Sequence, residues 1–321
     1  MAHVAKRLFV SLTLAAGVVT TAAAADFPGK PVRLVVPFSP GGTFDVEARL
    51  IAARLHENWR QPVIVENRAG ANTILGVDYA AKSAPDGHTL VLHAGSIVAT
   101  PQMQRTPYDF IRDLVAVVQT AEVRYVLAAS LRTGVSTMGE LIEIAKKDPN
   151  RLNYSSSGNG TPLHLYVELV KRAANVNLTH IPYKGNGPAM QALLAGDVDL
   201  IFDISSSIIP LAKAGKVRAL LVTGAKPFES LPNVPPFNTV YPGNSIDGWH
   251  GIFAPAATPR AIVEQIAADV REAVLSPDMA KRFREMGVEA TGVPSERFAE
   301  IVRRDYERWG QIIREKSIRV D

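Results

Sequence analysis

The sequence of 321 residues contains no cysteine. This absence excludes disulfides, thiolate metal ligands, a cysteine nucleophile and a lipid anchor on a lipobox cysteine. Stability must therefore come from the core alone. No charge of one sign dominates either, because 35 lysines and arginines face 31 aspartates and glutamates. This near balance argues against nucleic acid as a partner.

Long apolar runs are also missing. The longest, Leu8 to Val19, is too short for a good membrane span. It follows Lys6-Arg7 and precedes a stretch of small residues, Ala22 to Ala25, which is the pattern of a secretory signal peptide. We expect residues 1–25 to be removed near Ala24–Asp26, leaving a soluble protein exported to a bacterial periplasm. A retained N-terminal anchor is the alternative.

The motifs of common exported enzymes are absent. The chain has no Gly-x-Ser-x-Gly elbow and no His-Glu-x-x-His zinc signature, and its seven histidines lack metal-ligand spacing. Gly158-x-Gly160 also fails the dinucleotide fingerprint, because Leu163 stands in place of the third glycine. We therefore expect no catalysis, no metal and no cofactor. A hydrolase built from Ser156, His164 and Asp203 remains conceivable, since nothing in the sequence fixes their geometry.

The stretch from Val32 to Arg49 predicts a place where an anion can sit. A buried strand, Val32–Val36, is stopped by prolines, and Gly41-Gly42 allows a tight turn before a helix at about 45–58. Backbone N–H groups and the positive end of the helix dipole would meet there. An ordinary turn with nothing bound is the alternative. A similar serine- and glycine-rich loop, Ser155 to Thr161, recurs between a later strand and helix and favours binding.

Strands and helices alternate along the chain, which predicts an α/β fold of parallel, doubly wound sheets. The pattern restarts near Ser130, so we expect two lobes. Residues 26–130 with 244–321 would form lobe 1, and residues 131–243 would form lobe 2. Ligands bind outside the carboxyl ends of parallel strands, so the loops there would line a cleft between the lobes.

Several motifs, in this order, carry a family resemblance. They include Pro37-Phe38-Ser39-Pro40-Gly41-Gly42, Tyr154-x-Ser156-x-Gly158-x-Gly160, Pro182-Tyr183-Lys184-Gly185 and Ala195-Gly196-Asp197-Val198-Asp199. The chain resembles the substrate-binding proteins of tripartite tricarboxylate transporters, the Bug family, over essentially its whole mature length.

The resemblance implies a two-lobed periplasmic binding protein of type II-like fold, each lobe a sheet flanked by helices, with a ligand cleft between them. It implies a small carboxylate or related amide as ligand: a di- or tricarboxylate, an aromatic acid, an amino acid or a nicotinate-like compound. The partners would be the membrane permease subunits of a tripartite tricarboxylate transporter, and we expect a monomer. A ligand-sensing subunit for a membrane sensor kinase would have the same fold and is the second interpretation.

The expected ligand-binding residues lie in the loops that follow strands. They are Phe38, Pro40, Gly41, Gly42, Thr43, Phe44, Asp45, Gly95, Ser96, Ser156, Ser157, Gly158, Gly160, Thr161, His164, Tyr183, Lys184, Gly185 and Asp203.

Backbone N–H groups near Gly41, Gly42 and Phe44, and those of the Ser156–Thr161 loop, are expected to hold a carboxylate. For Asp45 a helix-capping role is favoured, and for His164 a structural one. Asp203 could accept a hydrogen bond from a ligand amine or cap the next helix. Phe44 stands where many relatives of the resembled family carry a small residue, and it could present an aromatic wall to the ligand.

Overall fold

The structure is a computed structural model that describes residues 27–224, 227–242, 248–315 and 318. The predicted signal peptide, residues 1–25, lies outside these residues, as does the predicted lobe boundary at 243–244. None of the helices in the described ranges combines the length and apolar composition needed to cross a membrane.

Six strands form the first sheet, in the order β11-β4-β10-β3-β1-β2. Their bounds are β1 (Val32–Val36), β2 (Val63–Asn67), β3 (Thr89–Ala94), β4 (Leu114–Val123), β10 (Gly248–Pro255) and β11 (Val288–Pro294). Every residue of β1 except Arg33 is buried, as expected of a central strand covered on both faces.

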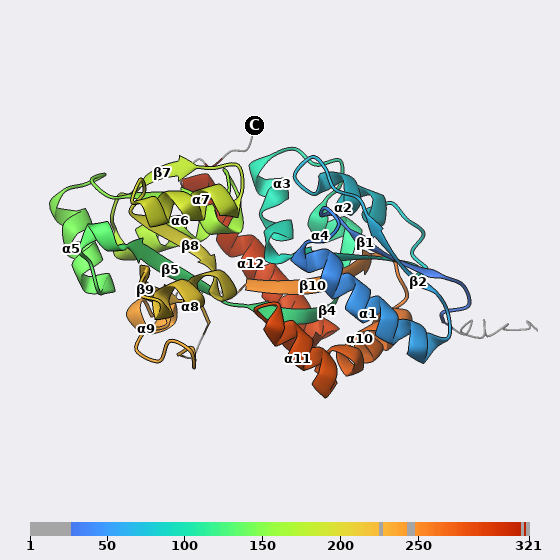
Figure 1. Ribbon diagram of the computed structural model, residues 1–321. Helices are drawn as coiled ribbons and strands as arrows, with labels where there is room; N and C mark the ends of the chain where they lie inside the picture. The colour runs from blue at the N-terminus through green and yellow to red at the C-terminus, as the bar shows by residue number, and fades with distance from the viewer. Residues whose placement is uncertain (1–26, 225–226, 243–247, 316–317, 319–321) are drawn as a thin grey trace, which may run out of the picture.

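Helices lie against this first sheet, and together they form what we call the first lobe (Figure 1). The helices are α1 (Thr43–Trp59), α2 (Ile74–Ala81), the 3-10 turn η1 (Gly95–Val98), α3 (Thr100–Met103), α4 (Phe110–Asp113), α10 (Arg260–Leu275) and α11 (Pro277–Glu285).

Five strands form the second sheet, in the order β7-β6-β8-β5-β9, and with its helices it makes the second lobe. The strands are β5 (Tyr125–Ser130), β6 (Asn153–Ser156), β7 (Thr179–Pro182), β8 (Leu200–Ile204) and β9 (Val217–Val222). The helices are the 3-10 turn η2 (Leu131–Thr133), α5 (Met138–Lys147), α6 (Pro162–Ala174), α7 (Asn186–Ala195), α8 (Ser205–Lys213) and α9 (Phe237–Val240).

The expectation of parallel sheets is right for some strands and wrong for others. β1, β2 and β3 are parallel, and so are β6, β7 and β8. By contrast, β10 runs antiparallel to β3 and β4, β11 runs antiparallel to β4, and β5 runs antiparallel to β8 and β9. These mixed pairings arise because the chain passes from one sheet to the other instead of winding around a single sheet.

The passage between the sheets lies earlier than the expected boundary after Ser130. β4 belongs to the first sheet and β5 to the second, so the chain crosses at Arg124. It returns to the first sheet between β9 and β10.

The last helix, α12 (Ser295–Glu315), spans both lobes and lies across the middle of the molecule (Figure 1). Phe298, near its start, is fully buried against Trp249 of the first sheet. Near its end, the Trp309 ring lies 5.7 Å from the Tyr166 ring of α6. The Glu315 carboxylate forms an ion pair with Arg172 of α6 at 3.1 Å. The helix therefore ties the two lobes together.

Candidate functional site

The loop between β1 and α1 is the first candidate binding element. Gly41 has a φ of +82°, a conformation that favours glycine, and Gly42 is the N-cap residue of α1. The helical hydrogen bonds begin with the Val46 N–H, which donates to the Gly42 carbonyl at 3.0 Å. Helix geometry therefore leaves the N–H groups of Thr43 and Phe44 without an intrahelical acceptor. Gly41, Gly42 and Thr43 are all exposed, as is Pro40.

Asp45 does not cap the helix in the way that the sequence suggested. It lies in the first turn, and α1 has no side-chain capping hydrogen bond at Gly42. Its carboxylate accepts the Gly41 N–H at 2.9 Å and pairs with Arg49 at 2.9 Å. The hydrogen bond from Arg49, followed by that from the Gly41 N–H, holds the pKa of Asp45 below its ordinary value. The Gly41 N–H, expected to face a ligand, is thus occupied within the loop.

Phe38 and Phe44 pack against each other at the edge of the same loop. Their rings are stacked with centroids 4.2 Å apart, and the other contacts run to buried histidines, from Phe38 to His93 and from Phe44 to His250. Both phenylalanines are half-buried. If an aromatic surface faces a ligand here, both phenylalanine rings form it, and His93 and His250 pack against them.

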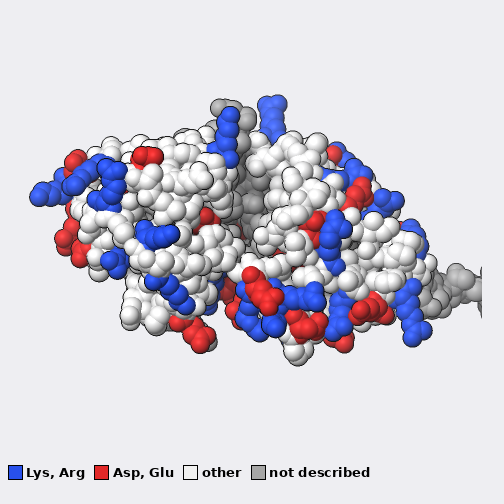
Figure 2. Space-filling view, in the orientation of Figure 1, with Lys and Arg blue, Asp and Glu red and all other residues white. Residues whose placement is uncertain are grey.

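Gly95 and Ser96 come directly after β3 and lie where the two lobes meet. A Cβ on Gly95 would stand 3.2 Å from the Trp249 ring, so the indole lies directly against the backbone. The same residues line a small cavity of about 10 Å³ together with Pro162 and Tyr166 of α6 and with Asp305 of α12. Elements of both lobes thus meet at this cavity, which has room for about one water molecule. Figure 2 shows a hollow between the lobes.

Asp305 is a residue that the sequence did not single out. It is buried, and its carboxylate accepts a hydrogen bond from the Trp249 indole at 2.8 Å. Burial raises its pKa, although Arg304 pairs with it at 3.1 Å. In the sequence, Asp305 stands among charged residues, so nothing there marks it as buried.

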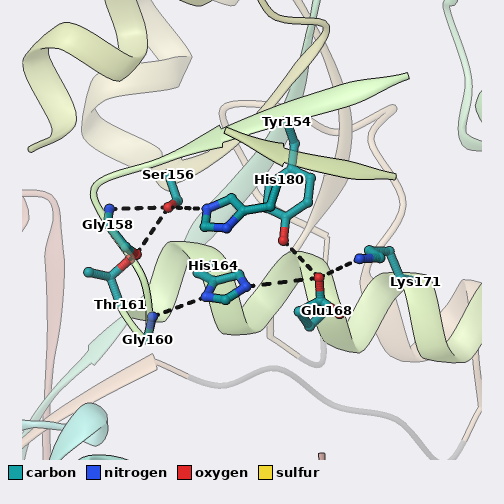
Figure 3. A network of polar contacts seen from close by, with 9 residues as sticks. All are labelled: Tyr154, Ser156, Gly158, Gly160, Thr161, His164, Glu168, Lys171 and His180. Carbon is teal, nitrogen blue, oxygen red and sulfur yellow. Dashed lines mark hydrogen bonds and ion pairs between the residues drawn. The ribbon is translucent and has the colours of Figure 1, made fainter. Parts of the chain in front are cut away.

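The loop between β6 and α6 is the second candidate binding element, and it makes many of its hydrogen bonds internally (Figure 3). The Gly158 N–H donates to the Ser156 hydroxyl at 3.1 Å. The Gly160 N–H donates to Nδ1 of His164 at 3.0 Å, and the Thr161 hydroxyl donates to the Gly158 carbonyl at 2.8 Å.

These internal bonds correct the expectation that the Gly158 and Gly160 amides point at a ligand. α6 has proline at its first position, and its helical bonds begin with Leu165 N–H to Thr161 carbonyl at 3.0 Å. Helix geometry leaves the N–H groups of Leu163 and His164 free of intrahelical acceptors. We therefore take these two first-turn N–H groups, and not the glycine N–H groups, as the candidate donors to a carboxylate in the second lobe.

The His164 ring is engaged within the second lobe in this arrangement. Its ring is buried and stacks on His180 of β7, with centroids 4.0 Å apart and planes 9° apart. His180 was missed by the sequence analysis, and its Nε2 lies 2.6 Å from the Ser156 hydroxyl. It lies in β7, and its position next to the β6–α6 loop follows from the pairing of β6 with β7, which the sequence did not predict.

The remaining predicted residues lie at the carboxyl ends of β6, β7 and β8. Ser157 is half-buried in the β6–α6 loop, Lys184 is exposed, and Gly185 is the N-cap of α7 with a φ of +109°. The Tyr183 N–H donates to the Ser156 carbonyl at 2.9 Å, which joins the β7 loop to the β6 loop.

Asp203, at the end of β8, is almost fully buried. Its carboxylate accepts hydrogen bonds from the Asn186 side chain at 3.0 Å and from the Ile204 N–H at 2.7 Å. Burial raises its pKa to about 6. Among the described residues, acidic and histidine side chains do not gather in groups that could hold a metal ion.

Two α/β lobes, joined by crossing segments, with a glycine loop between a parallel strand and a helix in each, define the class of two-lobed solute receptors. The chain belongs to the family described as tripartite tricarboxylate transporter family receptor, whose sequence model matches residues 47–318. The family resemblance and the two-sheet fold predicted from the sequence are therefore confirmed.

Individual relatives agree with this assignment. The chain is 30% identical over 309 residues to the protein BugT of Bordetella pertussis, covering 95% of each chain. Among solved structures it is similar to Rpa4515 of R. palustris with adipate, at 34% identity and a TM-score of 0.75, covering 92% of this chain and 99% of that one. It is also similar to MatC of Rhodopseudomonas palustris with bound malate, at 29% identity and a TM-score of 0.73, covering 89% of this chain and all of the other.

Proposed function

We propose that this chain is an exported periplasmic receptor that closes its lobes on a small dicarboxylate and delivers it to a tripartite tricarboxylate permease. Membership of the transporter receptor family supports this role. Two similar proteins of known structure hold adipate and malate, both dicarboxylates, which supports the ligand class.

One observation carries the proposal at the level of residues. Each lobe contains a strand, a glycine loop and a helix N-terminus in succession, through β1–α1 and β6–α6, and we infer that both loops face the hollow between the lobes. The first-turn N–H groups of Thr43 and Phe44 in one lobe, and of Leu163 and His164 in the other, are donors that suit carboxylates. Because the ligand has two acidic ends, each lobe would hold one of them.

We further propose that the chain binds its ligand without turnover. The hydrolase alternative needs an accessible serine, but Ser156 is fully buried and its hydroxyl is engaged by the loop and by His180. It also needs Asp203 to orient a histidine, whereas Asp203 bonds to Asn186 and to its neighbouring N–H. Both observations favour a receptor over an enzyme.

A thermal-shift screen followed by isothermal titration calorimetry tests the function. The mature chain would be mixed with adipate, malate, a tricarboxylate, an aromatic acid, an amino acid and nicotinate. We expect a dicarboxylate to bind at a one-to-one ratio and to stabilise the fold, by about 2.7 kcal/mol at a hundred times its Kd. Binding of the amino acid or the aromatic acid alone would overturn the ligand class. Ester hydrolysis by the purified chain would overturn the receptor function.

A further inference from the structure

The β6–α6 loop is held from beneath by two histidines (Figure 3). His164, on α6, accepts the Gly160 N–H through Nδ1 at 3.0 Å. His180, on β7, contacts the Ser156 hydroxyl at 2.6 Å, and that hydroxyl in turn accepts the Gly158 N–H. Both glycine amides of the loop are therefore positioned, directly or through one hydroxyl, by an imidazole.

The contact with Gly160 fixes the protonation state of His164. A backbone N–H can only donate, so Nδ1 of His164 must be unprotonated, and the neutral ring carries its proton on Nε2. An imidazolium at this position would direct an N–H at the N–H of Gly160. The loop in this shape therefore requires a neutral His164.

The stacking of the rings adds a second constraint on charge. Their centroids are 4.0 Å apart, and two unit charges at that distance repel by about 4 kcal/mol even at an effective dielectric constant of 20. The stacked pair is therefore unfavourable as a dication.

The other charged and titratable groups around the pair come from β6 and α6. Glu168 lies 3.9 Å from Nε2 of His164, and it also accepts from the Tyr154 hydroxyl at 2.8 Å and pairs with Lys171. Lys171 offsets much of the charge that Glu168 could offer to an imidazolium. The surroundings therefore leave the neutral pair as the stable form at neutral pH.

We propose that the stacked pair of His164 and His180 positions the second-lobe ligand loop, and that carboxylate affinity requires this pair to be uncharged. The inference rests on the proposed function, because it assigns the regulation of the same site. Protonation of the pair would break the Gly160 contact, displace the start of α6 and lower the affinity for a carboxylate. The two imidazole rings act as positioning groups: they hold the loop, whereas the proposed ligand donors of this lobe are main-chain N–H groups.

The pKa shifts of the two imidazole rings agree with a positioning role for the neutral pair. Burial lowers the pKa of His164, and it lowers the pKa of His180 to about 4, with a further lowering from the neighbouring His164. A lowered pKa keeps the pair neutral, and the loop intact, at neutral and mildly acidic pH. Affinity should then be lost as the pH falls toward 4.

The test compares two substitutions at position 164 by calorimetry with malate at pH 7 and pH 4. His164→Asn places an amide oxygen where Nδ1 stood, so it accepts the Gly160 N–H but cannot take up a proton. We expect it to bind malate more tightly than His164→Leu at pH 7, and to lose at least about threefold less affinity than the unaltered chain between pH 7 and pH 4. His164→Leu removes the acceptor and should weaken binding about tenfold at pH 7.

Two controls isolate the effect. Protonation of malate itself is common to all variants, so it cancels in the ratio of their affinities. His56→Asn changes an exposed histidine of α1 whose Nδ1 forms a hydrogen bond with the Gln61 carbonyl. Its affinity for malate should equal that of the unaltered chain at both pH values. Equal pH profiles for His164→Asn and the unaltered chain, or full affinity for His164→Leu, would overturn the inference.

A measurement without ligand separates this inference from the proposed function. In ¹⁵N nuclear magnetic resonance spectra, Nδ1 of His164 should have the shift of an unprotonated nitrogen at pH 7, and the Gly160 amide should move as the pair titrates. A proton on Nδ1 at pH 7, or a Gly160 amide shift that stays constant while the pair titrates, would refute the proposed role of the pair. If no acid binds the unaltered chain, the proposed function fails, and this titration still decides the inference.

Discussion

At the scale of single residues, the candidate site depends on which backbone donors remain free. Gly41 and Gly160 both sit in glycine loops, yet the first donates to Asp45 and the second to His164. The sequence predicted the loops but not this assignment, because it depends on how the Asp45 and His164 side chains are oriented. The same reason hid His180, whose role is set by a ring stacked across two elements.

A substitution at Gly42 tests the donors of the first lobe. Gly42→Pro removes one N–H at a φ of −80°, which proline accepts. If this N–H faces the ligand, its loss should weaken dicarboxylate binding about tenfold to a hundredfold, because a hydrogen bond to a charged group contributes about 1.5–3 kcal/mol.

Gly42→Ala is the matched control, measured by the same calorimetry. An alanine Cβ there would lie 3.6 Å from the nearest atom, an ordinary contact, and the N–H is kept. Its affinity should stay close to that of the unaltered chain. Equal affinities for the proline and alanine variants would mean that the carboxylate is held elsewhere.

At the scale of elements, periodicity and turn residues predicted most strands and helices, including β1 with both its ends. β11 was missed, because Gly292 and Pro294 within Val288–Pro294 are typical of loops. Antiparallel pairing was also missed, since strand order and direction depend on where the chain crosses between sheets. The crossing at Arg124 falls between two apolar strands that the sequence pattern assigned to one lobe.

Gly251 in β10 provides a test of packing between sheet and helix. A Cβ at this position would stand 2.2 Å from the Phe298 ring of α12, which is fully buried and packs against Trp249 at 5.0 Å. Gly251→Ala should therefore lower the free energy of unfolding by about 1–3 kcal/mol through overpacking.

Urea denaturation, monitored by circular dichroism, measures this loss. Gly187→Ala in α7 serves as the control, because an alanine Cβ there would have no neighbouring atom within 4 Å and alanine suits a helix. It should leave stability unchanged or slightly raised. A Gly251→Ala variant as stable as the control would show that the Phe298 ring of α12 does not pack closely against Gly251 of β10.

At the scale of the whole molecule, the two sheets, the crossing at Arg124 and the bridging helix α12 define two lobes. The resemblance of motifs predicted this architecture and the family. The sequence could not predict that α12 reaches from Phe298 in the first lobe to Trp309 beside Tyr166 in the second. That contact joins segments far apart in the chain, and no local pattern encodes it.

The central claim is that main-chain donors of both lobes share one dicarboxylate. A crystal structure of the mature chain with malate tests it most directly. We predict one carboxylate within hydrogen-bond distance of the Thr43 and Phe44 N–H groups, and the other end facing the start of α6 at Leu163. Malate bound away from both helix starts, or touching one lobe alone in a closed molecule, would contradict the account.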